Sequence, residues 1–246
     1  MKRGMLATWA RTLIVQASWN YDRMVGIGVA YAMEPLLRDL PGGRTNGRYA
    51  AALKRVAGFF NAHPYLTGMA AGALARVEYD GVPEAQADRL RRALIGPLGS
   101  VGDQLVWAGW LPMSVAVGLI VAVLVSVPAG VVSLLILYNV LHLGLRSWGL
   151  AAGWRAGIGV AGQLAGRVMH GGLRFSAAAA PFAIGVALPL VASWLLADFG
   201  GSERLGAGVV GLVGLLLARV LAPTLSGVRL GLLFLGTAIL AAWLWR

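Results

Sequence analysis

The stretch Leu105–Val125 (LVWAGWLPMSVAVGLIVAVLV) decides the fold class of this chain. It is apolar apart from Ser114, and its length matches the roughly 20 apolar residues that an α-helix needs to cross the hydrocarbon core of a bilayer. A chain crosses lipid only when its backbone N–H and C=O groups are paired, and a helix pairs them within itself. We therefore predict an integral membrane protein built from helices.

The composition of the whole chain supports this prediction. Hydrophobic residues make up 58% of the 246 residues, charged residues make up 13%, and the mean hydropathy is +0.73. These values argue against a soluble enzyme and against a disordered chain, because a soluble domain is about 45–50% apolar and about 25% charged. The formal charge of +11 is explained by arginines at the ends of membrane spans, so we expect no nucleic-acid partner. With no cysteine and only three histidines, we expect no metal and no cofactor.

Four further apolar stretches follow the first one. They are Val131–Leu145, Ala177–Ala197, Leu205–Leu221 and Gly227–Trp245. Val131–Leu145 is short for a span, so it either extends into the Gly-rich segment that follows or pairs closely with the preceding stretch. The fold class that we expect is an all-α integral membrane protein with about five transmembrane helices.

The chain divides near residue 104. Residues 1–104 hold 13 basic and 8 acidic residues, whereas residues 105–246 hold 8 basic and 2 acidic ones. The apolar runs Ile14–Met33 and Gly58–Ala75 are interrupted by polar residues, and charges inside a bilayer are costly unless they face a partner or a cavity. We predict amphipathic or re-entrant helices in the first part and a transmembrane helical bundle in the second.

The distribution of charge predicts the orientation. Residues 146–174 carry four arginines and no acid, which places this segment in the cytoplasm by the positive-inside rule. Alternation of the spans then places residues 198–204 outside. The start Met1-Lys2-Arg3 is similar to the n-region of a signal peptide, but Arg11 and Gln16 interrupt the apolar stretch after it, so we expect no cleaved signal.

The segment Gly96-Pro97-Leu98-Gly99-Ser100-Val101-Gly102-Asp103 lies at the start of the first span. Three glycines and a proline disfavour a helix interior, so we expect irregular backbone that lines a polar cavity. Asp103, Gln104 and Trp107 would then offer a carboxylate, an amide and an indole, which suit sugar hydroxyls and sugar C–H faces. An alternative stays open, in which Asp103 is the N-cap of the span that follows.

Three other motifs have two readings each. The cluster Ser18–Arg23 is either a ligand or subunit contact in the membrane, or an interfacial group at headgroup level. The segment Phe59–Tyr65 is either a loop with a hydrogen-bonded histidine or, with Asp103, the source of an acid–base pair for a membrane enzyme. The third motif consists of Gly149, Gly153 and Gly157, which are spaced four residues apart. Such glycines allow helices to approach closely, whether within the chain or against a partner.

Taken together, these motifs resemble a known family, the IID subunits of mannose-type phosphotransferase permeases. Gln16–Met24 resembles the N-terminal signature of that family, and Phe59–Tyr65, with Asn61, His63 and Pro64, is similar to its FFNTHP-type segment. Ile95–Asp103 resembles its GPLAGVGD motif, and residues 138–157 loosely resemble its N-x-x-R-x-x-x-G-x-x-x-G segment. Two departures are Gln104, where the family often has proline or serine, and the part after residue 175, which is similar only in being apolar.

The resemblance implies a multi-pass subunit of the inner membrane with no enzymatic activity of its own. Such a subunit pairs with a membrane IIC subunit, binds a hexose and carries it inward, while cytoplasmic IIA and IIB components transfer the phosphoryl group. The sugar site that the resemblance implies is formed by Gln16, Trp19, Asn20, Asp103 and Gln104. The alternative is a structural or regulatory membrane protein that keeps the fold and moves no sugar.

Overall fold

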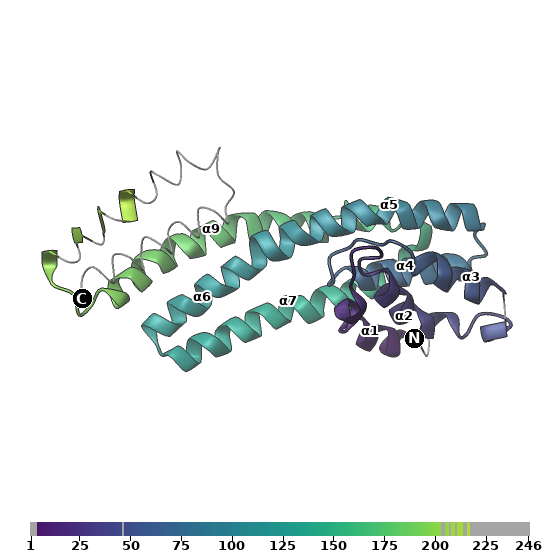
Figure 1. The fold of residues 1–246 in the computed structure, drawn as a ribbon, viewed down its shortest axis with the longest axis horizontal. Coiled ribbons are helices and arrows are strands. Elements are labelled where there is room, and N and C mark those ends of the chain that lie inside the picture. Colours follow the sequence, from purple (N-terminus) through teal and green to yellow (C-terminus); the bar gives the residue numbers. More distant parts are fainter. Residues whose placement is uncertain are drawn as a thin grey trace. The chain divides into compact units, whose positions relative to one another are not determined.

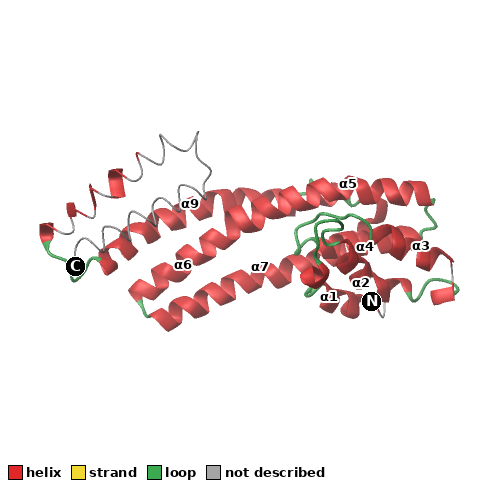
Figure 2. Ribbon diagram, viewed as in Figure 1, coloured by secondary structure: helices red, strands yellow, loops and turns green. Residues whose placement is uncertain are grey.

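The computed structural model describes residues 4–45, 47–202, 205–206, 208–209, 211–213 and 216. Residues 1–191 form one compact unit, and residues 192–246 form a second. The described elements are all helices, joined by turns and loops (Figure 2). The expected all-helical fold is therefore confirmed.

Short helices make up the first third of the chain. They are α1 (Gly4–Thr12), α2 (Gly26–Leu37), α3 (Gly47–Val56) and α4 (Thr67–Tyr79), with the 3₁₀ turns η1 (Val15–Ser18) and η2 (Gly43–Thr45) between them. α2 and α4 are buried on nearly all sides because small and apolar residues occur around their whole circumference. Ile14–Met33 and Gly58–Ala75 are thus not spans, since each is a loop followed by a helix packed inside protein.

Long helices make up the rest of the compact unit (Figure 1). A continuous helical rod runs through α5 (Glu84–Gly102), the π-helical η3 (Asp103–Trp110) and α6 (Leu111–Leu124), and α7 (Val127–Ala156) returns beside α6. The turn η4 (Gly157–Gly159) and the short α8 (Ala161–Leu164) lead into α9 (Arg167–Leu195). Pro128 sits in the first turn of α7, where a missing N–H costs nothing, whereas Pro112 lies inside the continuous rod, directly after η3.

Three helical stretches among the described residues are long and apolar enough to cross a membrane. They are Glu84–Leu124, Val127–Gly159 and Ala161–Leu195. The short candidate Val131–Leu145 is part of a longer helix and extends into the Gly-rich segment, as one of its two readings predicts. The expected count of five spans is not confirmed, because Gly227–Trp245 lies outside the described residues and Leu205–Leu221 lies mostly outside them.

The prediction of irregular backbone over residues 96–103 is wrong. Residues 84–102 form one helix, and Pro97 lies inside it. Asp103 has helical dihedral angles (φ −64°, ψ −42°) in the middle of the rod, so it is not the N-cap of a span either. The glycines serve packing, since a Cβ placed on Gly102 would lie 2.2 Å from the Cβ of His63.

Glycines also allow α4 and α7 to pack in backbone contact. A Cβ on Gly153 would lie 2.1 Å from the carbonyl oxygen of Met69, and a Cβ on Gly72 would lie 2.6 Å from that of Leu150. Gly157 ends α7 with φ +50°, a backbone conformation that residues other than glycine rarely adopt. The Gly-x3-Gly-x3-Gly spacing therefore positions α7 against the buried helix α4.

Candidate functional site

Three sequence motifs meet where the short helices adjoin the rod. The N–H of Val25 donates to the carbonyl of Phe60 at 3.1 Å, and the N–H of Phe60 donates to the carbonyl of Arg23 at 3.2 Å. The N–H of His63 donates to the carbonyl of Leu98 on α5 at 3.2 Å. Backbone hydrogen bonds therefore join the Ser18–Arg23 cluster to the Phe59–Tyr65 loop, and that loop to the glycine-rich helix.

The first of these loops is held in a tight turn. The N–H of Met24 donates to the carbonyl of Asn20 at 2.8 Å, and the side-chain oxygen of Asn20 accepts from the N–H of Arg23 at 2.9 Å. Met24 has φ +51°, which is uncommon for a residue with a Cβ and costs about 1–2 kcal/mol. Beside it, the rings of Trp19 and Tyr21 meet edge to face at 4.8 Å, with Trp19 46% exposed. The turn thus presents an indole at the surface.

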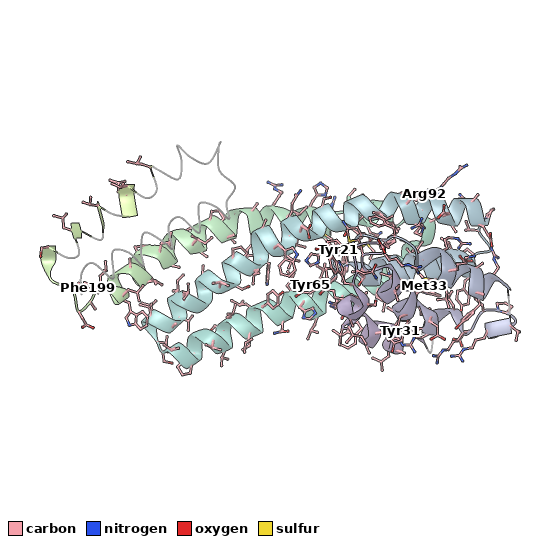
Figure 3. The ribbon with its side chains drawn as sticks, in the orientation of Figure 1. Tyr21, Tyr31, Met33, Tyr65, Arg92 and Phe199 are labelled. Carbon is pink, nitrogen blue, oxygen red and sulfur yellow. The ribbon has the colours of Figure 1, made fainter. Side chains whose placement is uncertain are left out.

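A cluster of aromatic and histidine rings connects the second loop to α7. Tyr65, labelled in Figure 3, lies edge to face with His63 at 4.9 Å and stacks on His142 at 4.3 Å. Its hydroxyl bonds to that of Tyr138. His63 also packs against Trp107 of η3, with ring centroids 5.1 Å apart. The cluster therefore links the loop, η3 and α7.

Burial keeps His63 neutral. The side chain is 2% exposed, and burial together with the positive charge of Arg146 lowers its pKa to about 4. Its Nδ1 accepts from the N–H of Tyr65 at 3.2 Å, which agrees with the interpretation of Phe59–Tyr65 as a loop with a hydrogen-bonded histidine. In the part of the chain that the structure describes, His63 makes no hydrogen bond to Asp103. Nothing in this geometry supports an acid–base pair.

Arg146 is a buried guanidinium at the centre of this junction. It is 3% exposed, lies 5.0 Å from the ring centre of Tyr65 and donates to the carbonyl of Thr12 at the end of α1. No carboxylate pairs with it among the described residues. A carbonyl and an aromatic face stabilise the charge instead, so Arg146 fixes α1 against α7.

The five residues that the resemblance implies for a sugar site form two pairs and one separate residue. Asp103 and Gln104 are exposed on η3, and Trp19 and Asn20 lie in the tight turn, while Gln16 is exposed on η1. Within the described chain, no hydrogen bond joins one pair to the other directly. The Phe59–Tyr65 loop connects them, since it bonds to the turn on one side and to α5 on the other.

The structural motif residues lie around this loop. Pro64 is buried, and its carbonyl accepts from the hydroxyl of Thr67 at 2.7 Å, which starts α4. Asn61 is exposed, and its Nδ2 lies 3.8 Å from where a Cβ on Gly99 would stand. Gly96 faces open space. Of the three glycines of the motif, only Gly102 is required by close packing, because a Cβ on Gly99 would make an ordinary contact and one on Gly96 would meet nothing.

Sequence reasoning missed several groups that the structure places here. Tyr138, His142 and Arg146 are spaced four residues apart on α7, a spacing that puts them on one helix face, and this signal could have found them. A hollow between η3 and α9 is lined by Gln104, Arg174 and Ser176. Arg174 comes from a distant segment, and only the packing of α9 against η3 brings it to Gln104.

These features define an all-helical, multi-pass membrane protein in which a polar and aromatic junction joins short N-terminal helices to long apolar ones. The chain belongs to the mannose/fructose/sorbose family of phosphotransferase-system IID components. The family model described as "PTS system mannose/fructose/sorbose family IID component" matches residues 1–246.

Individual relatives are similar over different lengths. The chain is 29% identical over 171 residues to the sorbose-specific EIID component of Klebsiella pneumoniae, covering 68% of this chain and 61% of the relative. It is 30% identical to the mannose-specific EIID component of Escherichia coli strain K12, covering 63% and 56%. It thus spans less than two thirds of the length of these two relatives. The fructose permease IID component of Bacillus subtilis is 25% identical over 252 residues, covering 100% of this chain and 88% of the relative.

Two solved structures have the same fold. One, described as the structure of a membrane protein, superimposes with a TM-score of 0.73 at 21% identity and covers 98% of this chain and 97% of its own. The other is a cryo-EM structure of the mannose transporter ManYZ in complex with microcin E492, with a TM-score of 0.59 at 22% identity and the same two coverages. At these identities the likeness establishes the fold.

Proposed function

We propose that this chain is the IID subunit of a sugar phosphotransferase permease in the inner membrane. It binds and translocates a hexose together with a IIC subunit, and IIA and IIB components carry out the phosphoryl transfer. The names of the relatives, which are specific for sorbose, mannose or fructose, favour a hexose. The chain itself contributes binding groups and no catalytic group.

One observation carries the proposal. Asp103 and Gln104 are exposed where the apolar part of the helical stretch Glu84–Leu124 begins, and Asp103 has no partner within the described chain. A carboxylate that faced lipid at this position would be costly. A partner subunit and a polar ligand remove that cost when they cover η3, and a family that assembles as a permease supplies both.

The chemistry of these groups suits a sugar. The carboxylate of Asp103 accepts hydrogen bonds from hydroxyls, the amide of Gln104 both donates and accepts, and the half-exposed indoles of Trp19 and Trp107 cover C–H faces. η3 is π-helical over eight residues, and wide helical turns of this kind recur at functional sites. The wider turn changes the angular spacing of side chains between Asp103 and Trp107. Translocation then follows from alternating exposure of these groups in the complex with IIC.

Replacing one carboxylate tests the proposal. We expect Asp103→Asn to lower sugar uptake in cells about 10- to 100-fold, the loss for hydrogen bonds to a charged group, and to leave co-purification with IIC unchanged. Asp39→Asn removes the same charge at another exposed position and is the matched control.

Uptake of Asp103→Asn at the wild-type rate would show that the site assignment is wrong. A pull-down of the tagged wild-type chain in mild detergent tests the larger claim. Recovery of a IIC-like polytopic protein and a IIB component supports a working permease. Recovery of the chain without them would favour the scaffold that moves no sugar.

A further inference from the structure

A basic hollow lies on the N-terminal helices. Its volume is about 500 Å³, and residues of α1, α2, η2 and α3 line it. Tyr31, labelled in Figure 3, marks its α2 wall. The charged residues that line it are Arg11, Glu34, Arg38, Arg44 and Lys54. No part of the proposed transport mechanism uses this hollow.

Glu34 holds the arginines in place. Its carboxylate accepts from Arg11 at 2.8 Å, from Arg38 at 2.7 Å through two nitrogens, and from Arg44 at 3.1 Å. The hydroxyl of Tyr49 donates to the same carboxylate at 2.8 Å. The guanidinium of Arg11 also lies 4.2 Å from the ring centre of Tyr31 and donates to its carbonyl. Glu34 therefore holds the three arginines in place before any ligand arrives.

One carboxylate does not neutralise this group. Four cations and one anion line the hollow, which leaves a net charge of +3 (4 − 1). Three arginines carry fifteen N–H donors between them, whereas a carboxylate offers about four lone-pair positions. Arg38 and Arg44 keep 45% and 64% of their side chains exposed. Donors and charge therefore remain available for an anion from outside the chain.

The rest of the wall is apolar. Ile27, Tyr31 and Leu53 line the hollow beside the cations, and the first two are 37% and 49% exposed. A small soluble anion would use the arginines and leave these apolar groups in water. A molecule with a phosphate head and an acyl chain covers both kinds of surface, because hydrocarbon burial adds to the charge attraction.

We propose that this hollow binds an anionic phospholipid, with its phosphate on the arginines and Lys54 and its acyl chain along Ile27, Tyr31 and Leu53. The site fixes the N-terminal helices to the lipid headgroups of the membrane surface. It shares no residue with the proposed sugar site.

Lipid binding by the full-length purified chain tests the proposal. Native mass spectrometry compares phosphatidylglycerol with phosphatidylcholine that carries the same acyl chains. We expect phosphatidylglycerol to be retained preferentially, and the double variant R44Q/K54Q to weaken its binding about tenfold, since each basic group near an anionic headgroup contributes a few-fold. The control R89Q/R155Q removes two exposed positive charges outside the hollow and should bind as the wild type does.

The single variant Lys54→Gln controls for misfolding, because within the described chain the Lys54 side chain has no hydrogen bond or ion pair to lose. We expect it to weaken phosphatidylglycerol binding about threefold at an unchanged melting temperature. Equal binding of the two lipids, or equal losses in both double variants, would overturn the proposal. Displacement of the lipid by the same concentration of glycerol 3-phosphate would overturn it in favour of a soluble phosphate. Lipid binding that survives in R44Q/K54Q, together with a loss of co-purification with an acidic cytoplasmic protein, would also overturn the proposal. That result would favour a protein partner.

Discussion

Glu34 is the residue on which the N-terminal helices converge. Burial alone would raise the pKa of its carboxyl, but hydrogen bonds from Arg38, Tyr49, Arg11 and Arg44 outweigh this and lower the pKa from 4.5 to about 2. A carboxyl with a lowered folded-state pKa adds stability above its unfolded pKa and loses it as the pH falls towards the folded value. Glu34 therefore stabilises the fold fully above about pH 4.5 and loses this effect towards pH 2.

We expect Glu34→Gln to lower the free energy of unfolding at pH 7 by on the order of 2 kcal/mol, because the variant leaves three arginines without the one carboxylate charge that attracts them. The difference from the wild type should shrink as the pH falls from about 4.5 towards 2. Thermal unfolding in detergent over this pH range measures it. Glu84→Gln is the control, since that side chain is 67% exposed and 3.6 Å from Arg55. A loss for Glu34→Gln that did not change with pH would contradict the electrostatic account.

At the scale of elements, α7 shows what glycine spacing does in this fold. Gly144 and Gly153 lie on the same helix, but a Cβ on Gly144 would meet no atom within 4 Å, whereas one on Gly153 would overlap the backbone of Met69. We expect Gly153→Ala to lower the free energy of unfolding by about 1–3 kcal/mol as α4 and α7 are forced apart. Gly144→Ala should have no effect or stabilise by up to about 1 kcal/mol, because alanine favours a helix more than glycine does. Equal unfolding temperatures for the two variants would show that close packing of α4 on α7 is not needed.

The same helices show how far the sequence predicts the elements. Apolar length identified the three long helices, and glycine spacing indicated close packing, because both depend on local pattern. The composition rule for glycine and proline failed at residues 96–103, since tertiary packing of the His63 loop against Gly102 favours a helix there. The π-helical turn of η3 has no signal in composition.

At the scale of the whole molecule, the site could be predicted only as separate pieces. The motifs that contain Trp19, His63 and Asp103 were recognisable one by one, but the hydrogen bonds that join the two loops to each other and to α5 come from backbone atoms, which every residue has. Arg174 reaches Gln104 only through the packing of α9, and the basic hollow needs three helices to assemble. A local sequence pattern contains no information on contacts between distant segments. Only the structure therefore shows which residues lie together in the site and in the hollow.

The orientation of the whole chain remains a prediction, and α7 makes it testable. Its 30 residues are about 45 Å long, which exceeds a hydrocarbon core of about 30 Å. We therefore expect the turn at Val125 and the connection after α7, which contains Gly162 on the short α8, to lie on opposite sides of the membrane. Arginines near this connection predict that it lies in the cytoplasm.

Because the chain has no cysteine, a single cysteine can report each side without background. Both positions are exposed, and a Cβ on Gly162 would meet nothing within 4 Å. We expect a membrane-impermeant maleimide to label Val125→Cys in intact cells and to label Gly162→Cys only after the membrane is opened. Leu135→Cys, half exposed in the apolar part of α7, should resist labelling in both cases because lipid excludes the reagent. The reverse pattern at the two turns would invert the orientation, and labelling of both turns in intact cells would mean that α7 does not cross the bilayer.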